Sequence, residues 1–337
     1  MVPRPMALGK ASGTPMSGPR VLIARYSAIG DCVMAAPVPS RIRRSHPNSF
    51  LVWAIEDRCA DVVDSERLID VVAVDERTKW RRQGPRSWGP KLRFWLSLRK
   101  HKFDLGLDLQ GYPKTALCLA FARPRRTVSV GGKDALSRML VPSMKGYDPS
   151  LHIVERNLAA LGELGDFPGD AAPILPEYRD IRDRLRQDWP AETPLASLSV
   201  GAGHSNKAYP AEKWAEVAQG LIARGFAVAL LGGPEVQAPQ IPGAIDYVGR
   251  LRLRESMAVV ASSALHLAAD TGSGHIAAGY GVPVVSLFGA TAVARFRPYT
   301  DNGVVLEGEG SPATLDPSQV LQAATELWER NARAISH

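Results

Sequence analysis

The sequence lacks the residue patterns that identify several common classes of protein. It holds 3 cysteines in 337 residues, and none of them forms a Cys-x-x-Cys pair. A disulfide framework, a zinc knuckle and a redox couple are therefore not indicated, and a reducing cytosol is the expected compartment. No apolar run reaches the roughly 18 residues of a transmembrane helix, so no membrane-spanning segment is predicted.

Motifs for metal and nucleophile chemistry are absent as well. The sequence contains no Asp-x-Asp, no His-Glu-x-x-His and no Gly-x-Ser-x-Gly, and its 7 histidines form no cluster with ligand spacing. We therefore expect neither a bound metal nor a cofactor. The charge excess is small, 41 Lys and Arg against 34 Asp and Glu. A net charge of +7 hints at an anionic partner without identifying it.

The composition is that of a globular protein with 45% hydrophobic and 22% charged residues. At roughly 150 residues per domain, the length predicts two domains. Residues 1–19 are rich in Pro, Gly and Ser and lack the apolar core of a signal peptide, so we expect a flexible tail there. We expect an N-terminal domain over 20–175 and a C-terminal domain over 176–337, because a Pro-, Gly- and Asp-rich stretch lies between them.

Short apolar runs alternate with amphipathic stretches in both halves. Strands are predicted over 21–24, 50–55, 69–74, 104–109, 127–130, 195–200, 226–231, 265–268 and 282–287. Helices are predicted over 33–44, 92–100, 113–121, 153–164, 178–187, 211–223, 255–261, 274–280 and 317–330. This alternation predicts an α/β fold of two Rossmann-like halves, each with a parallel, doubly wound sheet. Ligands of such sheets bind beyond the carboxyl ends of the strands.

The turn after the first strand, residues 25–31, places Gly30 beside Asp31. A carboxylate at such a turn lies near backbone N–H groups that can bind an anion. The alternative is that Asp31 is simply the N-cap of the next helix, because aspartate is a favoured cap. Spacing alone favours the cap.

The turn after the strand at 195–200 reads Gly-Ala-Gly-His-Ser-Asn-Lys. It fails as a dinucleotide fingerprint because Asn206 stands at the third glycine position, and it fails as a Walker A loop because Ala208 follows Lys207. A loop of small residues that ends in lysine still suits a pyrophosphate, with Lys207 as a point charge. The alternative is an exposed turn lysine.

Two further turns in the second half carry polar residues. Residues 269–275, Ala-Asp-Thr-Gly-Ser-Gly-His, open an apolar helix, and their hydroxyl and N–H groups resemble a phosphate cradle. His275 is either a phosphate donor or a core histidine. Glu235, beyond the strand at 226–231, either holds a ribose hydroxyl or caps a helix.

One segment is strongly basic. Between positions 79 and 102 there is no acidic residue, and Trp80, Trp88, Phe94 and Trp95 lie among the basic residues. The nine basic residues are Lys79, Arg81, Arg82, Arg86, Lys91, Arg93, Arg99, Lys100 and Lys102. Such a pattern can bind nucleic acid or an anionic membrane surface, whereas a merely solvated face usually mixes signs. Because the phosphate-cradle candidates lie mostly in the other half, two anionic ligands are indicated, one per domain.

Taken together, these segments resemble glycosyltransferase family 9, the lipopolysaccharide heptosyltransferases, over roughly residues 20–329. The resemblance rests on five segments in order: RVLIARYSAIGDCVMAAPV (20–38), FDLGLDLQGYPKTAL (103–117), HIVERNLAALGELG (152–165), GAGHSNKAYPAEKW (201–214) and ADTGSGHIAAGYGVPVVSLFG (269–289). It implies the two-domain glycosyltransferase B-type fold, with two Rossmann-like domains facing each other across a cleft. The acceptor would be bound by the N-terminal domain and the nucleotide sugar by the C-terminal one.

The resemblance also implies an activity and roles for individual residues. It implies inverting transfer of a heptose from ADP-heptose to a lipopolysaccharide inner-core or similar acceptor, with Asp31 as the general base. Matching positions imply that the donor is bound by Gly203, Lys207, Glu235, Asp270, Thr271, Gly272 and His275. We expect the acceptor to be bound by Ser27, Gly30, Gln110 and Gly111. The expected partners are a nucleotide sugar, an anionic glycan or lipid-linked acceptor and the inner-membrane surface, with the protein peripheral on its cytoplasmic side and no nucleic acid bound.

The sequence departs from the family pattern in the donor region. Tyr209 stands where the family usually has Trp, and Ala202 and Gly203 replace residues that carry hydroxyl groups in some members. Phosphate contacts would then come from backbone N–H groups. Two alternatives stay open on the sequence: an NAD-dependent sugar-nucleotide epimerase or dehydrogenase, and a non-catalytic binder of an anionic polymer or membrane surface.

Overall fold

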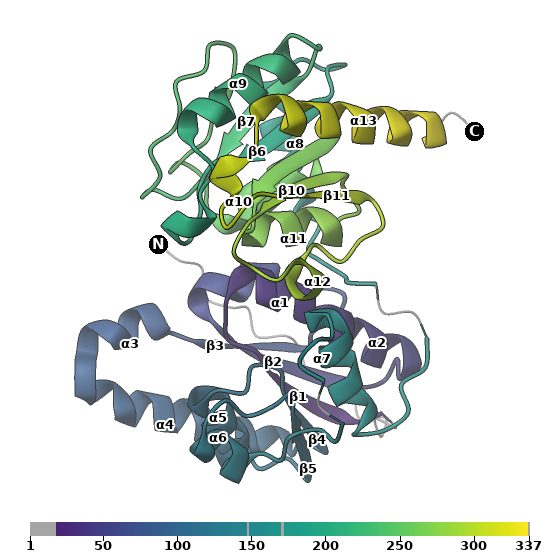
Figure 1. The fold of residues 1–337 in the computed structure, drawn as a ribbon. Helices are drawn as coiled ribbons and strands as arrows, with labels where there is room; N and C mark the ends of the chain where they lie inside the picture. The colour runs from purple at the N-terminus through teal and green to yellow at the C-terminus, as the bar shows by residue number, and fades with distance from the viewer. Residues whose placement is uncertain (1–17, 147, 170–171, 336–337) are drawn as a thin grey trace.

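The structure is a computed structural model that describes residues 18–146, 148–169 and 172–335. It contains two parallel sheets that follow one another along the chain (Figure 1). The prediction of an α/β fold with two Rossmann-like halves is confirmed. The tail predicted over residues 1–19 lies outside the described residues except for positions 18 and 19.

The first sheet has five strands in the order β3-β2-β1-β4-β5, and all neighbouring pairs are parallel. Its strands are β1 (Arg20–Ala24), β2 (Phe50–Glu56), β3 (Val71–Asp75), β4 (Leu105–Asp108) and β5 (Arg126–Ser129). In the central strand β1, Ile23 lies between Trp53 and Leu107. Its run of four apolar residues is fully buried because helices cover both faces of the sheet.

The second sheet has six strands in the order β11-β10-β9-β6-β7-β8, again all parallel. Its strands are β6 (Leu195–Ser199), β7 (Ala227–Leu231), β8 (Ile245–Asp246), β9 (Leu265–Ala269), β10 (Val284–Phe288) and β11 (Gly303–Glu307). The two edge strands β8 and β11 were not predicted from the sequence. In each sheet the chain continues outward from its first strand, β1 or β6, in one direction and then switches to the other side of that strand. Ligands of doubly wound sheets bind at this switch point.

Helices surround both sheets. In the first half they are α1 (Ile29–Ala35), α2 (Pro37–Ser45), α3 (Arg77–Gln83), α4 (Trp88–Ser97), α5 (Pro113–Ala122), α6 (Ala135–Leu140) and α7 (Ile153–Gly162). In the second half they are α8 (Arg179–Leu185), α9 (Ala211–Ile222), α10 (Leu253–Ala261), α11 (Gly272–Gly279), α12 (Val293–Phe296) and α13 (Pro317–Ile335). Short 3₁₀ helices are η1 (Asp57–Val62), η2 (Gly84–Ser87), η3 (Leu98–His101), η4 (Arg186–Asp188), η5 (Ser205–Lys207) and η6 (Pro312–Thr314). None of the helices described here is both long and apolar enough to cross a membrane.

The helix predicted over 33–44 is wrong in its limits, because the chain forms two helices there. Pro37 begins α2, since its ring clashes with the preceding turn and it has no N–H to continue α1. The first helix starts earlier than predicted, at Ile29, with Ala28 as its N-cap. Asp31 is therefore in the first turn of α1 and is not the N-cap.

The two halves contact each other mainly through α1 and α11, which lie one above the other between the sheets (Figure 1). One hydrophobic cluster continues across this contact and includes Val33 of α1 and Ile276 of α11. Leu175, in the connection between the halves, closes the same cluster: a Cβ atom on Gly279 would come 2.5 Å from its Cδ1 atom. The functional turns of both halves are held together by this packing.

A buried histidine in the second sheet gives a prediction about stability. His266 on β9 lies opposite Ser197 on β6, with its Nδ1 atom 2.8 Å from the serine Oγ, and burial lowers its pKa to about 3. The folded protein therefore keeps this ring neutral, whereas the unfolded chain takes up a proton below about pH 6.5. We expect the free energy of unfolding to fall by up to about 1.4 kcal/mol per pH unit below that value through this one group.

Urea unfolding between neutral and mildly acidic pH measures this effect. The variant His266→Gln cannot titrate at this position, and its stability should change less with pH than that of the wild type. His204→Gln, at an exposed position, is the matched control and should keep the wild-type slope. Equal slopes for wild type and His266→Gln would contradict the prediction.

Candidate functional site

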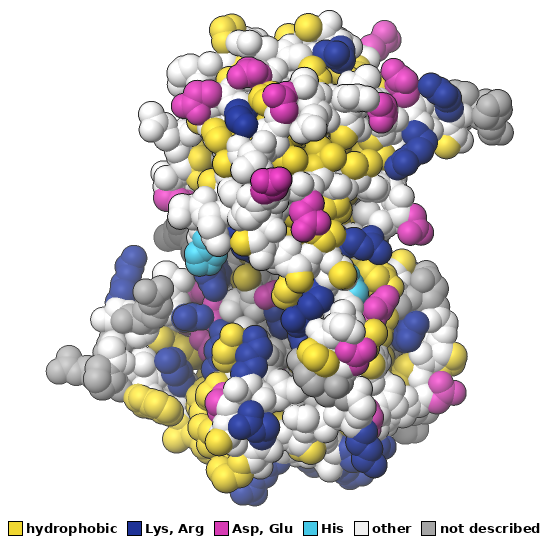
Figure 2. Space-filling view, viewed as in Figure 1, with side chains coloured by type: hydrophobic (Ala, Val, Ile, Leu, Met, Phe, Trp, Pro, Cys, Tyr) yellow, Lys and Arg dark blue, Asp and Glu magenta, His cyan; other side chains and the backbone are white. Residues whose placement is uncertain are grey.

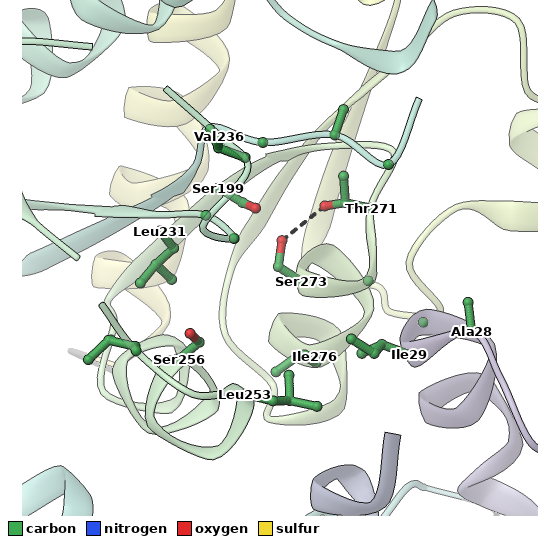
Figure 3. A pocket seen from close by; sticks show the side chains of 18 of the residues that line it. Ala28, Ile29, Ser199, Leu231, Val236, Leu253, Ser256, Thr271, Ser273 and Ile276 are labelled. Atoms are coloured by element: carbon green, nitrogen blue, oxygen red, sulfur yellow. Dashed lines mark hydrogen bonds between the residues drawn. The ribbon is translucent and has the colours of Figure 1, made fainter. Parts of the chain in front are cut away.

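Side chains beyond the carboxyl ends of both sheets line two neighbouring pockets. The first has a volume of about 430 Å³, and turns after β6, β7 and β9 contribute most of its lining. Ala28 and Ile29 of the first half close it on one side (Figure 3). Apolar side chains from α10 and α11, Leu253 and Ile276 among them, form one wall, while glycine-rich turns form another. An apolar wall beside free backbone N–H groups suits a nucleotide.

The N-terminus of α11 lies at this first pocket. Its N-cap residue Thr271 has extended backbone, and its side chain caps no N–H group of the helix. Instead, Thr271 Oγ1 lies 3.1 Å from Ser273 Oγ (Figure 3). Thr271, Gly272 and Ser273 all line the pocket. The first-turn N–H groups, both hydroxyls and the positive end of the helix dipole together favour a bound anion.

Four of the seven predicted donor residues line the first pocket, namely Gly203, Glu235, Thr271 and Gly272. Lys207 forms an ion pair with Asp270, the residue that directly precedes Thr271. Asp270 is nearly buried, so it holds the ammonium group of Lys207 in place. The structure thus brings Lys207 next to the N-terminus of α11, and the alternative of a freely exposed turn lysine does not describe it.

Asp31 lies in the first turn of α1 and lines the second pocket, of about 590 Å³. Its carboxylate forms an ion pair with Arg25 and accepts a hydrogen bond from the backbone N–H of Ala28 at 3.3 Å. Arg25 is buried and also donates to the carbonyl of Leu109, so it fixes the carboxylate. The side chain of Asp31 is 32% exposed and accessible from the pocket.

Gly30 and Gly272 form a close contact between the two halves. A Cβ atom on Gly30 would come 2.7 Å from Cδ2 of His275, and one on Gly272 would come 3.1 Å from the backbone N of Gly30. His275 is buried under this contact, and burial lowers its pKa to about 4 although Asp31 and Asp270 oppose the shift. The structure places His275 beside Gly30 and not in the lining of either pocket.

This contact gives a prediction for Gly30→Ala. The added methyl group would clash with the ring of His275 and crowd Gly272, which we expect to lower the free energy of unfolding by about 1–3 kcal/mol. Because Asp31 follows directly, kcat should fall as well. Gly162→Ala is the matched control, because a Cβ atom there meets nothing within 4 Å. Urea unfolding and activity measurements check both variants, and wild-type values for Gly30→Ala would contradict the prediction.

The predicted acceptor residues lie in different places. Ser27 and Gln110 line the second pocket with Asp31, and Gln110 holds the turn after β1, since its amide donates to the Ser27 carbonyl at 2.9 Å. Gly30 instead lines the first pocket. Gly111 lines neither pocket; this turn requires glycine because its φ is +74° and a Cβ atom would collide with a neighbouring backbone carbonyl.

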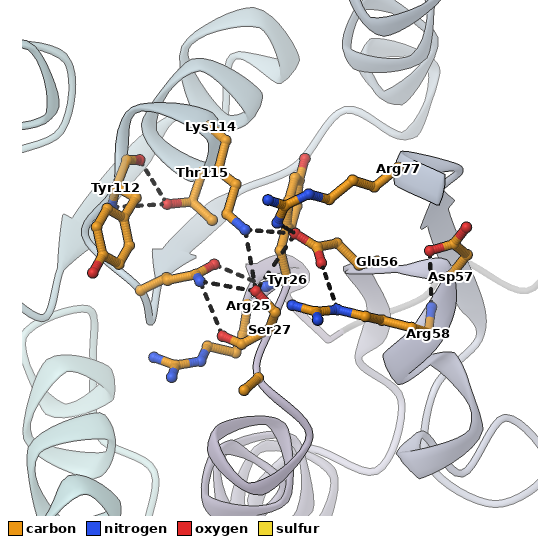
Figure 4. Close-up of polar contacts among 12 residues, drawn as sticks. Arg25, Tyr26, Ser27, Glu56, Asp57, Arg58, Arg77, Tyr112, Lys114 and Thr115 are labelled. Atoms are coloured by element: carbon orange, nitrogen blue, oxygen red, sulfur yellow. Dashed lines mark hydrogen bonds and ion pairs between the residues drawn. The ribbon is translucent and has the colours of Figure 1, made fainter. Parts of the chain in front are cut away.

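A cluster of cationic groups around Glu56 was not found by sequence reasoning. Glu56, at the end of β2, is buried and accepts from Lys114 at 2.6 Å, from Arg58 at 3.0 Å and from Arg77 (Figure 4). Burial alone raises its pKa, but the hydrogen bonds from Lys114 and Arg77 hold the pKa below the usual range. Three cations share this carboxylate, and the carboxylates of Asp57 and Asp75 nearby offset only part of the remaining positive charge.

This positive charge faces the pockets of the first half. Arg77 and Lys114 line the second pocket together with Lys133. Arg77 also lines an adjoining pocket of about 400 Å³, whose other charged residues are Arg58, Arg82 and Asp57. These residues are widely separated in the sequence, and the acid-free run at 79–102 contains only Arg82 of them. The sequence signal available was the motif at 103–117, which includes Lys114. Within the described ranges, no group of three or more His, Cys, Asp or Glu side chains is placed to hold a metal ion.

Comparisons with known proteins identify similar chains. The model of glycosyltransferase family 9 (heptosyltransferase) matches residues 91–321, more than half of the chain. Lipopolysaccharide heptosyltransferase 1 of Pseudomonas aeruginosa is 27% identical over 288 residues, covering 81% of this chain and 79% of the relative. Lipopolysaccharide heptosyltransferase 3 of Escherichia coli is 25% identical over 295 residues, covering 81% and 83%.

Solved structures share the fold. A glycosyl transferase family 9 protein from Veillonella parvula superposes with a TM-score of 0.80 at 18% identity, covering 94% of this chain and 99% of that one. The E. coli heptosyltransferase WaaC with ADP gives a TM-score of 0.76 at 20% identity, covering 91% and 99%.

Proposed function

Because the chain belongs to glycosyltransferase family 9, and is therefore a glycosyltransferase, we propose that it transfers a heptose from ADP-heptose with inversion. The acceptor is a lipopolysaccharide inner-core glycan or a similar anionic glycan. The proposal is supported by relatives that are lipopolysaccharide heptosyltransferases and by the WaaC neighbour, whose structure contains ADP. It is further supported by the geometry of the two pockets.

The observation that carries the proposal is the position of Asp31 at the turn that the two pockets share. Ala28, the N-cap of α1, lines both pockets, and Asp31 follows three residues later in the first turn of that helix. On the other side of this turn lie Thr271 and Gly272, at the anion-binding end of α11. A donor diphosphate at α11 and an acceptor hydroxyl in the second pocket would thus meet beside one carboxylate.

In the proposed reaction Asp31 takes the proton of the acceptor hydroxyl. The hydroxyl oxygen attacks the anomeric carbon of the heptose and forms the new glycosidic bond. The bond from that carbon to the diphosphate oxygen breaks, and its electron pair leaves with ADP. General-base assistance of this kind is worth about 10²–10⁴ in rate. Arg25 holds the carboxylate in place before the substrate binds.

Negative charge develops on the departing diphosphate, and the chain offers fixed groups to stabilise it. These groups are the ammonium of Lys207, the hydroxyls of Thr271 and Ser273 and the first N–H groups of α11. We propose that these groups do the work that a divalent cation does in enzymes with an Asp-x-Asp motif, a motif this sequence lacks. Transfer in the presence of EDTA tests this part of the proposal.

The cationic cluster of the second pocket supports an anionic acceptor. Arg77, Lys114 and Lys133 line the pocket that contains Asp31, and Glu56 neutralises only part of their charge. Carboxylate or phosphate groups on the acceptor would complete these pairs. We propose that this acceptor is lipid-linked and that the enzyme works at the cytoplasmic face of the inner membrane.

A thermal-shift series with ADP, UDP, GDP and CDP tests the donor. A ligand at 100 times its Kd stabilises the folded state by about 2.7 kcal/mol, so the preferred nucleotide is readily identified. We expect ADP to give the largest shift, and a transfer assay with ADP-heptose to give a product of inverted anomeric configuration. A clear preference for UDP, or bound NAD in the purified protein, would overturn the proposal.

A further inference from the structure

The outer surface of three neighbouring helices in the first half, α4, α5 and α6, carries exposed apolar side chains. Helix α4 packs on α5, and α5 packs on α6 (Figure 1). Trp88 and Leu92 on α4 are 63% and 38% exposed, and Leu136 and Met139 on α6 are 40% and 75% exposed. We call the surface formed by these four side chains and the half-buried Leu117 and Phe121 of α5 the α4–α6 face.

Exposed apolar groups are concentrated in this region. Among the described residues, six large hydrophobic side chains are exposed, and four of them belong to the α4–α6 face. A fifth, Tyr112, is the N-cap of α5. Figure 2 shows hydrophobic side chains at the surface over these helices, beside Lys and Arg side chains. Apolar groups gathered on one surface indicate an interaction site, whereas scattered ones do not.

The charge around this face is mostly of one sign. Residues 79–140, which include all three helices, contain 15 Lys and Arg but only three acidic residues, Asp104, Asp108 and Asp134. Asp108 is fully buried, and Asp134 caps the N-terminus of α6. Exposed basic residues on these three helices and the loops that leave them include Arg93, Arg99, Lys100, Arg123 and Arg138. Together with exposed Trp, Leu and Met side chains, this is the composition of a surface that lies on anionic lipid headgroups.

The face begins at the rim of the second pocket. Lys133 lines that pocket and donates to the Tyr112 hydroxyl at 3.0 Å, with its ammonium 4.1 Å from the centre of the Tyr112 ring. Leu136, in the first turn of α6, follows Lys133 by three residues. A glycan that extends from a bilayer beneath the face would therefore reach Asp31 without leaving the protein surface.

Nucleic acid and protein partners fit this face less well. Two of the four aromatic residues between positions 79 and 102, Trp80 and Trp95, are buried and cannot stack on bases. The most exposed apolar group of the face is Met139, which has no ring to stack on a base. The centres of protein interfaces are depleted in Lys and other charged residues. An anionic bilayer, in contrast, can take up apolar side chains and attract the basic residues around them.

We propose that the α4–α6 face docks on an anionic phospholipid bilayer, with Trp88, Leu136 and Met139 entering the headgroup region. The inference deepens the proposed function, on which it rests for the lipid-linked nature of the acceptor. The docked protein holds its second pocket next to the membrane surface. Apolar insertion and electrostatic attraction act together, so that binding weakens when either is removed.

Co-sedimentation with vesicles tests the docking. The wild type should bind vesicles of phosphatidylglycerol and phosphatidylcholine, bind pure phosphatidylcholine weakly, and be released by salt. Trp88→Ser and Met139→Ser should each weaken binding about tenfold. Arg93→Gln should weaken it about fivefold. The matched controls are Tyr299→Ser and Arg330→Gln, at exposed positions of the second half, and they should bind as the wild type does.

Transfer assays separate this inference from the proposed function. With an acceptor glycan freed of its lipid, Trp88→Ser and Met139→Ser should keep the wild-type kcat, which also shows that they fold. With the acceptor embedded in anionic vesicles they should be slower. Absence of transfer to either acceptor would refute the proposed function alone. Absence of vesicle binding by an active wild type, equal binding by all variants, or tighter binding to RNA than to vesicles would overturn the docking.

Discussion

Asp31→Asn is expected to reduce kcat for sugar transfer by about 10²–10⁴ and to leave the Kd for ADP nearly unchanged. The amide keeps the shape of the side chain but cannot take a proton from the acceptor hydroxyl. The nucleotide should still bind, because its pocket is lined mainly by the second half of the chain. Steady-state kinetics and calorimetric titration with ADP measure the two effects separately.

Two controls make the Asp31 result specific. Asp301→Asn, at an exposed position of the second half, should behave as the wild type. Arg25→Met removes the ion pair but leaves the carboxylate, so it should retain more activity than Asp31→Asn does. Near-normal turnover by Asp31→Asn would contradict the proposal that Asp31 is the general base, whatever the result with Arg25→Met.

Lys207→Met is expected to lower kcat by about 10²–10³ and to weaken ADP binding as well. Two effects act in the same direction here. The ammonium group no longer offsets the charge that develops on the diphosphate, and Asp270 loses its partner. A nearly buried, unpaired carboxylate beside an anionic ligand repels that ligand. Kinetics with ADP-heptose and titration with ADP measure the loss.

A double variant separates these two effects. Lys207→Met with Asp270→Asn removes the unpaired carboxylate, so ADP binding should recover in part while kcat stays low. Arg250→Met is the matched control, because Arg250 also forms an ion pair with an aspartate, Asp246, but at an exposed position. Wild-type kcat for Lys207→Met would contradict a role at the diphosphate.

The sequence predicts the central strands of both sheets well, because each is a short apolar run that helices bury on both faces. It does not predict β8, which has only two residues. The limits of α1 were wrong because apolar periodicity continues through Pro37, while the missing N–H of proline ends the helix. Asp31 lies in the first turn because α1 begins at Ile29, four residues before the start predicted from the apolar pattern.

The contacts of the candidate site depend on strand order, which a single sequence does not give. Gln110 reaches Ser27 because β4 lies next to β1, although 83 residues separate them. Glu56 forms ion pairs with Arg77 and Lys114 for the same reason, because the carboxyl ends of β2, β3 and β4 lie at one edge of the sheet. The motif resemblance selects Asp31, Lys207 and Asp270 but not Arg25, and the ion pairs of Asp31 with Arg25 and of Lys207 with Asp270 are visible only in the folded chain.

The contact of Gly30 with Gly272 and His275 has a consequence for how this enzyme can diverge. Apart from the turn at residues 27–31, the two pockets draw on different segments of the chain, and these segments approach that turn from opposite sides. We expect substitutions after β7 or β9 to alter the choice of nucleotide sugar, and substitutions after β3 or β4 to alter the choice of glycan. Natural selection can therefore change one specificity while the other is inherited intact, provided that the two glycines are kept.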